Sequence, residues 1–283
     1  MRVGFIGLGN MGLGMARNLV KAGFETFVRD LRQAAVDELV AAGATAAGSS
    51  AEVARDADLI CVAVFTSEQI RQVVLGSEDE PGVLAGARPG SVVALHSTIE
   101  PAVVAEVAGA AAELGVQVID VAMTGGGDVA AADGTLTFLV GGDEAAVALA
   151  RPALAAMSRS IHHVGGLGSG VTAKIVSNFL LDGTIALVRE ALRIAESGGI
   201  PESRILEIVG DGGVGSSWVS NNWPRIRTQE AEHWDGARGV VAMWHKDVKL
   251  AHSLARANGV HAPVLGFLVS DIAPEITDRG LTV

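Results

Sequence analysis

Residues 1–14, Met-Arg-Val-Gly-Phe-Ile-Gly-Leu-Gly-Asn-Met-Gly-Leu-Gly, contain the pattern that decides the fold. Residues 3–6 form a short apolar run typical of a buried strand, and residues 11–22 are typical of a helix. Between them, Gly7, Gly9 and Gly12 have the spacing G-x-G-x-x-G. In this context the first glycine allows a tight turn, the second lets the backbone approach a pyrophosphate, and the third lets helix and strand pack closely. Because the free N–H groups at the start of the helix also favour phosphate, the segment predicts a dinucleotide site. A purely structural turn is the alternative. The predicted cofactor-binding residues here are Gly7, Leu8, Gly9, Asn10, Met11 and Gly12.

The composition is that of a globular protein rather than a membrane or nucleic-acid-binding one. Nearly half of the 283 residues are apolar, yet no run approaches the roughly 18 uninterrupted apolar residues needed to cross a bilayer. The glycines of the first turn interrupt any signal-peptide core. Cys61 is the only cysteine, which excludes an intrachain disulfide, and the net charge of -11 argues against nucleic acid as a partner. We therefore expect a cytoplasmic location.

The pattern of apolar runs divides the chain into two parts. Up to residue 164, strand-like runs alternate with helical segments, which is typical of a mostly parallel, doubly wound α/β sheet. From residue 171 onward the pattern is almost entirely helical, beginning with a long helix at 171–196. A cluster of glycines at 165–170 separates the two. We therefore predict an N-terminal Rossmann domain at 1–164 and an all-α C-terminal domain at 165–283, joined by the long helix, and ligand sites favour such boundaries.

Asp30 ends the second predicted strand, eighteen residues after the last glycine of the turn. An acidic residue there accepts hydrogen bonds from the ribose hydroxyls of the cofactor and repels a 2′-phosphate. This favours NAD over NADP as the cofactor. Arg29 and Arg32 flank it and can bind a phosphate if they turn inward. The alternative is that Asp30 simply caps the following helix.

Lys174 and Asn178 are the candidate catalytic residues. They are four apart, so they share one face of the helix that follows the glycine cluster. A lysine on a helix is ordinarily a solvated charge, but here the helix starts beside the predicted cofactor site.

Four motifs in order resemble the β-hydroxyacid dehydrogenases, the group of 3-hydroxyisobutyrate dehydrogenase and tartronate semialdehyde reductase. Residues 4–12 resemble the family's cofactor motif, residues 120–127 (Asp-Val-Ala-Met-Thr-Gly-Gly-Gly) its substrate motif, residues 165–178 its catalytic motif, and residues 246–251 (Lys-Asp-Val-Lys-Leu-Ala) its C-terminal motif. The resemblance covers the whole chain. It implies a 6-phosphogluconate dehydrogenase-like C-terminal domain and a homodimer or homotetramer.

The resemblance also implies the roles of individual residues. Lys174 stands at the position of the family's catalytic lysine, and the substrate carboxylate falls to Thr124, Gly125 and Gly126. Lys246 is implied on the cofactor side of the site, and Val64, Phe65 and Thr98 complete the predicted cofactor-binding set. No residue is assigned to a metal.

These residues predict an NAD-dependent oxidoreductase that transfers a hydride between NAD and a small β-hydroxy acid or its semialdehyde. Lys174 takes the hydroxyl proton in oxidation and returns it in reduction, while Asn178 orients the hydroxyl. A lysine near its ordinary pKa of about 10.4 is a poor base at neutral pH. This role therefore requires burial and nearby charge that lower the pKa of Lys174.

Two departures from the family pattern concern the substrate. Thr124 stands where the family usually has serine, which keeps the hydroxyl and adds a methyl group. Residues 230–244 also depart from the usual aromatic-rich pattern. Two alternatives remain: an imine reductase of the same fold, whose usual acid is aspartate or tyrosine rather than Lys174, and a dinucleotide-binding regulator without turnover.

Overall fold

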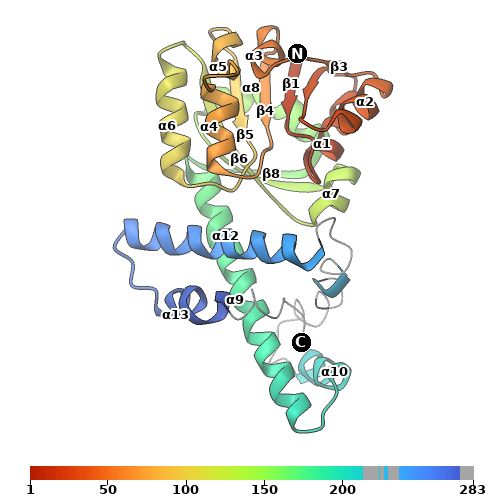
Figure 1. Ribbon diagram of the computed structural model, residues 1–283, viewed down its shortest axis with the longest axis vertical. Coiled ribbons are helices and arrows are strands. Elements are labelled where there is room, and N and C mark those ends of the chain that lie inside the picture. The colour runs from red at the N-terminus through yellow and green to blue at the C-terminus, as the bar shows by residue number, and fades with distance from the viewer. Residues whose placement is uncertain (213–222, 224–225, 229–235, 275–283) are drawn as a thin grey trace. The chain divides into compact units, whose positions relative to one another are not determined.

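The computed structural model describes residues 1–212, 223, 226–228 and 236–274. The chain forms two compact units, Met1–Lys174 and Ile175–Val283 (Figure 1). The glycine cluster at 165–170 lies within the first unit.

The first unit is built on an eight-stranded sheet with the order β3-β2-β1-β4-β5-β6-β7-β8. Strands β1 to β6 are parallel, β7 is antiparallel to β6, and β8 is parallel to β7. The order of the first six strands is that of a Rossmann sheet, so the predicted α/β class is confirmed. The strands are β1 (Arg2–Ile6), β2 (Glu25–Arg29), β3 (Thr45–Ala46), β4 (Leu59–Val62), β5 (Val92–Leu95), β6 (Gln117–Thr124), β7 (Leu136–Gly141) and β8 (Ser158–Gly165).

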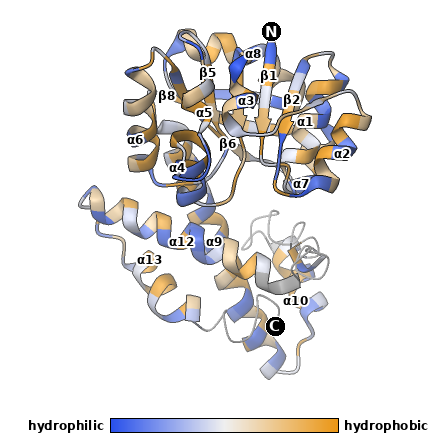
Figure 2. Cartoon of the chain, turned by 45° about the horizontal axis from the view of Figure 1, so that its top comes forward, coloured by the Kyte–Doolittle hydropathy of each residue, from blue (hydrophilic) through white to orange (hydrophobic). Residues whose placement is uncertain are grey.

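Helices cover both faces of this sheet. The helices whose buried side chains join the apolar cluster on one face are α1 (Gly12–Lys21), α2 (Gln33–Ala41), α7 (Gly127–Asp133) and α8 (Glu144–Met157). Those on the other face are α3 (Ser50–Arg55), α4 (Ser67–Leu75), α5 (Val83–Gly86) and α6 (Pro101–Ala112). Alternation along a strand sends Phe5 into the first cluster and Ile6 into the second. Strands buried on both faces have near-continuous apolar runs, and the central strands are coloured mostly as hydrophobic in Figure 2.

The start of α3 shows half of a capping box, formed by Ser49 and Glu52. The Ser49 side chain accepts a hydrogen bond from the Glu52 N–H at 3.1 Å. The Glu52 carboxylate, however, accepts from the N–H of Gly48 at 2.7 Å rather than from Ser49. A complete capping box occurs instead at the start of α4, between Thr66 and Gln69.

Among the residues that the structure describes, helices are the regular elements of the second unit. Its elements are α9 (Ser169–Ser197), which begins in the first unit, then α10 (Glu202–Gly212), α12 (Gly236–Ala257), α13 (Pro263–Phe267) and a π-helical turn η1 (Leu268–Ile272). Their apolar side chains form a separate core that includes Ile185, Trp223, Trp244 and Val248.

Helix α9 is long and apolar enough, by length and composition alone, to cross a membrane. Core helices of soluble proteins pass the same test. Asp182 and Arg189 lie on α9 and are only 5% and 2% exposed. Buried charges need polar partners, so this face of α9 is typical of a helix packed inside a protein.

Candidate active site

The glycine turn has the geometry that dinucleotide binding requires. Gly7 has a φ of +93°, and a Cβ there would lie 2.5 Å from the carbonyl oxygen of Ala63. A Cβ on Gly12 would lie only 1.9 Å from the carbonyl oxygen of Gly7, so α1 packs against the turn only because this residue is glycine. A Cβ on Gly9 would meet nothing within 4 Å. The space beside Gly9 is therefore open for the close approach of a phosphate, which fits a dinucleotide.

The remaining residues of the turn differ in what they expose. The Leu8 side chain is completely buried in the core, so only its backbone faces the turn. Asn10 is exposed and Met11 half-buried. Met11 is also the residue that precedes α1, where no side chain caps the helix. The N–H groups of this first turn therefore have no side-chain cap, which suits an anion.

Asp30 lies directly against the glycine turn. One carboxylate oxygen accepts from the N–H of Leu8 at 2.5 Å and the other from the N–H of Arg32 at 2.8 Å. Its side chain is 12% exposed, and the Arg32 guanidinium lies 3.4 Å away. The residue that precedes α2 is Arg32, so Asp30 does not cap that helix. Its position beside the turn suits an acceptor for ribose hydroxyls.

Arg29, the other basic neighbour of Asp30, is held by Glu80. Its guanidinium donates to both carboxylate oxygens, at 3.0 and 2.8 Å. The Glu80 carboxylate also accepts from the N–H of Ser50 at 3.2 Å. These contacts, with Arg29 foremost, lower the pKa of Glu80. A bidentate pair fixes the guanidinium geometrically, so Arg29 is directed toward Glu80.

Val64, Phe65 and Thr98 lie just beyond the ends of β4 and β5. The Ser97 hydroxyl donates to the carbonyl oxygen of Val64, which ties these two strand ends together. Phe65 is 49% exposed and its N–H donates to Gln69 at 2.8 Å. The parallel register of the two strands places all three predicted residues at the carboxyl edge of the sheet. This is the edge at which ligands bind in such sheets.

Thr124 is the last residue of β6 and is half-buried. It pairs with Thr137 of the antiparallel strand β7. Gly125, Gly126 and Gly127 follow with φ angles of +97°, +142° and +64°. Such angles are rare for residues with a Cβ, so the turn that follows the Thr124 hydroxyl requires glycine at these positions.

Helix α9 carries both candidate catalytic residues. Lys174 is half-buried and Asn178 is 7% exposed. In the second unit, the Asn178 amide donates to the Asp247 carboxylate at 2.5 Å. Because a carboxylate only accepts, this bond directs the nitrogen of Asn178 toward Asp247 and leaves its oxygen on the opposite side. The Lys246 ammonium lies 3.9 Å from the same carboxylate.

Three acidic residues that hydrogen-bond to α9, Asn178 or Arg29 are not among the residues predicted from the sequence. Asp120, which binds the first turn of α9, interrupts an apolar strand, and a buried charge there signals a need for partners. Asp247 adjoins Lys246 within the C-terminal motif. Glu80 comes from a loop 51 residues beyond Arg29, and no local pattern indicates that pair.

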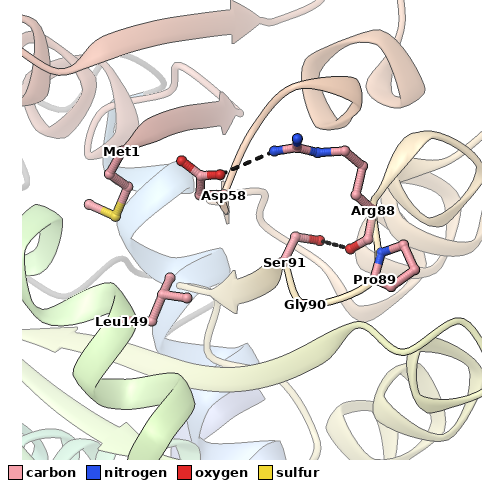
Figure 3. Close-up of a pocket in the computed structure, with 7 residues that line it drawn as sticks. All are labelled: Met1, Asp58, Arg88, Pro89, Gly90, Ser91 and Leu149. Carbon is pink, nitrogen blue, oxygen red and sulfur yellow. Dashed lines mark hydrogen bonds and ion pairs between the residues drawn. The ribbon is translucent and has the colours of Figure 1, made fainter.

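None of the predicted site residues lines either of two hollows in the first unit. The larger, of about 500 Å³, is lined by Met1, Asp58, Arg88 and Ser91 among others, where β1, β4 and β5 begin (Figure 3). Arg88 donates to Asp58 at 3.1 Å, and the Ser91 hydroxyl donates to the carbonyl oxygen of Arg88 at 2.7 Å. The polar groups of this larger hollow therefore hydrogen-bond to one another. The hollow lies at the edge of the sheet opposite the glycine turn. The smaller, of about 400 Å³, adjoins the first turns of α9.

Within the part of the chain that the structure describes, no group of three His, Cys, Asp or Glu side chains is placed to hold a metal. Within the segment 230–244, whose departure from the family pattern concerns the substrate, residues 230–235 lie outside the described residues.

A Rossmann sheet with a glycine turn after β1 and an acidic residue at the end of β2 defines the first unit as dinucleotide-binding. The model of the NAD-binding domain of 6-phosphogluconate dehydrogenase matches residues 2–165. The NAD-binding model of NADP-dependent 3-hydroxyisobutyrate dehydrogenase matches residues 168–273. The chain belongs to the β-hydroxyacid dehydrogenase family, and it is an NAD-dependent oxidoreductase of that family.

Individual relatives agree with this. The NAD-dependent L-serine dehydrogenase of Pseudomonas aeruginosa is 38% identical over 93% of this chain and 88% of its own length. The 3-hydroxyisobutyrate dehydrogenase of the same organism is 36% identical over 95% and 90%. The crystal structure of a 3-hydroxyisobutyrate dehydrogenase from Salmonella typhimurium is 31% identical with a TM-score of 0.84, covering 100% of this chain and 96% of that one. An imine reductase from Streptomyces aurantiacus, 20% identical with a TM-score of 0.67, shares the fold.

Proposed function

We propose that the protein oxidises a small β-hydroxy acid to its semialdehyde, with Lys174 as the general base and, in the reverse direction, the general acid. The observation that carries the proposal is the half-buried Lys174 one helical turn before Asn178, whose carboxamide is oriented by Asp247. Oxidation removes a proton from the hydroxyl and a hydride from the carbon that bears it. Bound NAD supplies the hydride acceptor.

Each residue then has a distinct task. The neutral amine of Lys174 accepts the hydroxyl proton, and the Asn178 oxygen accepts a hydrogen bond that orients the reacting groups. The Thr124 hydroxyl and the N–H groups of Gly125 and Gly126 donate to the substrate carboxylate, which fixes the face of the carbon that reacts. Asp30, the glycine turn, Val64, Phe65, Thr98 and Lys246 form the proposed cofactor-binding set.

The substrate class follows from chemistry that the relatives' names share. L-serine, 3-hydroxyisobutyrate, 2-(hydroxymethyl)glutarate and L-threonate each have a carboxylate and a hydroxyl on the carbon β to it. The methyl group of Thr124 narrows the region beside the carboxylate, which favours the smaller acids.

A substrate panel tests the proposal. The enzyme is mixed with NAD and, in turn, 3-hydroxyisobutyrate, 3-hydroxypropionate, L-serine, glycerate or L-threonate, and NADH absorbance is followed. We expect turnover with at least one of the first three. NADH formation from none of these acids, together with NADPH or NADH consumption on a cyclic imine, would favour an imine reductase. NAD binding without turnover on either set would favour a regulator.

We further propose a homodimer or homotetramer. Leu180, Leu187 and Ile194 lie on α9 at seven-residue spacing and are 64%, 70% and 72% exposed. Apolar side chains at this spacing form one stripe along a helix, and such stripes commonly mark interfaces. Light scattering should give two or four times the 28.9 kDa of one chain. A monomer at micromolar concentration would contradict the proposal.

We also propose a cytoplasmic location. The only cysteine, Cys61, is completely buried in β4 and has no disulfide. A chain without disulfides suits a reducing compartment. Fractionation of the source cells tests this.

A further inference from the structure

Asp120 is a charged residue in the middle of an otherwise apolar strand. It is 0% exposed and pairs with Leu95 of β5 on one side and Gly141 of β7 on the other. A charge in the interior of a sheet is costly unless hydrogen bonds satisfy it. The presence of Asp120 therefore requires an explanation in terms of what its carboxylate binds.

The carboxylate binds the beginning of α9. One oxygen accepts from the N–H of Gly168 and the other from the N–H of Val171, both at 2.7 Å. The first N–H groups of a helix have no partner within the helix. The Asp120 carboxylate is the acceptor for two of these backbone N–H groups. Burial raises the pKa of Asp120, and these N–H groups oppose that shift by stabilising the charged form.

Two glycines make room for this contact. A Cβ on Gly141 would lie 2.5 Å from one Asp120 oxygen, and a Cβ on Gly170 would lie 2.8 Å from the other. Since real Cβ atoms do not approach an oxygen so closely, any other residue at either position would displace the carboxylate or the helix. The contact between Asp120 and the first turn of α9 thus requires glycine both at position 141, on β7, and at position 170, on α9.

The contact determines where Lys174 lies in the first unit. Lys174 follows Val171 by three residues, a rise of about 4.5 Å along the helix axis. Val171 is itself completely buried in the apolar cluster of that unit. On β6, Thr124 lies four residues beyond Asp120 and therefore on the same face of the strand. Strand β6 thus carries both Asp120, which binds the start of α9, and Thr124, whose hydroxyl is proposed to bind the substrate.

We propose that Asp120 is a positioning residue, which fixes the first turn of α9 on β6 and thereby sets Lys174 in register with Thr124. The inference rests on the proposed function, because it gives Lys174 the role of acid and base. A misplacement of about 1 Å costs on the order of 100-fold in rate, so loosening this anchor affects the chemical step more than cofactor binding.

The test compares the variant Asp120→Asn with the same substitution at Asp143, a second aspartate that caps a helix. An asparagine offers one acceptor oxygen and places its NH₂ group against the second N–H, so one hydrogen bond becomes a donor–donor contact. Asp143→Asn is the control: one oxygen of Asp143 caps α8 in the same unit by accepting from both Ala145 and Ala146, at 2.9 and 3.3 Å, so asparagine keeps both bonds, and α8 carries none of the proposed site residues.

We expect Asp120→Asn to lower kcat roughly 10- to 100-fold, with the KM for NAD within about twofold of the wild-type value. Asp143→Asn should leave both within about twofold. In a Lys174→Ala background, Asp120→Asn should lower the residual kcat by less than about threefold, because its effect passes through Lys174. A merely structural role would lower the amount of active enzyme equally in both backgrounds.

Either of two results would overturn the proposal: an unchanged kcat in Asp120→Asn, or a loss of the same size whether or not Lys174 is present. If Asp120→Asn does not fold, Asp120→Ser replaces it, since serine is smaller and keeps a polar hydroxyl at the position. Lys174→Ala alone tests the proposed function separately: high activity in that variant removes Lys174 from the mechanism, whatever Asp120 does.

Discussion

His96 gives the first unit a stability that depends on pH. It directly follows β5, is 0% exposed, and lies between Phe5 and Phe138 with ring centroids 6.2 and 5.5 Å away. Its Nδ1 lies 3.1 Å from the carbonyl oxygen of Val121. Because a carbonyl only accepts, Nδ1 carries the proton of the neutral ring. Burial lowers the pKa of His96 from 6.5 to about 4.

The sign and size of the effect follow from this shift. The folded protein keeps His96 neutral down to about pH 4, whereas the unfolded chain takes up a proton near pH 6.5. The contribution to stability is therefore fully present above pH 6.5 and is lost as the pH falls toward 4. At 1.36 kcal/mol per pKa unit, the loss is about 3 kcal/mol.

The assay is urea unfolding of wild type and His96→Met at pH 7, 6, 5 and 4. Methionine fills the apolar site and cannot take up a proton, so the variant should lose about 3 kcal/mol less between pH 7 and 4. The control is His162→Gln, which removes an exposed histidine of the same unit and should follow the wild-type curve. Parallel curves for wild type and His96→Met would refute the reasoning.

Three substitutions test the binding assignments through kcat/KM. Thr124→Val keeps the shape but removes the donor to the carboxylate, and at ~1.5–3 kcal/mol for that bond kcat/KM for the acid should fall about 10- to 150-fold; an unchanged value would mean that Thr124 only packs. Asp30→Ala should narrow the preference for NAD over NADP, and a wild-type enzyme faster with NADP would contradict the ribose assignment. Glu80→Gln weakens the hold on Arg29, so kcat/KM should rise for NADP and stay constant for NAD; no change with either cofactor would show that Arg29 does not reach the 2′-phosphate.

Most of the first unit was predictable because its signals are local. The apolar run at 3–6 and the glycines that follow specify a strand and a turn within a dozen residues. The direction of β7 was not predictable, because the apolar run at 136–140 is the same whether the strand pairs parallel or antiparallel.

The residues of the candidate site could be proposed from the sequence only where they form motifs. Lys174 and Asn178 are four apart on one helix, so a single segment indicates them. Asp120 meets α9 about 50 residues later in the chain, and Glu80 meets Arg29 at a similar separation. Such contacts depend on the folded sheet, and neither residue type nor spacing reveals them.

The central claim is that Lys174 moves the proton in an NAD-dependent oxidation. The most direct test measures kcat and the Kd for NAD in Lys174→Ala with the best substrate of the panel. We predict that kcat falls by roughly 10²–10⁴, the range for loss of a general acid–base, while the Kd for NAD stays within about twofold. A variant that keeps a tenth or more of the wild-type kcat would contradict the claim.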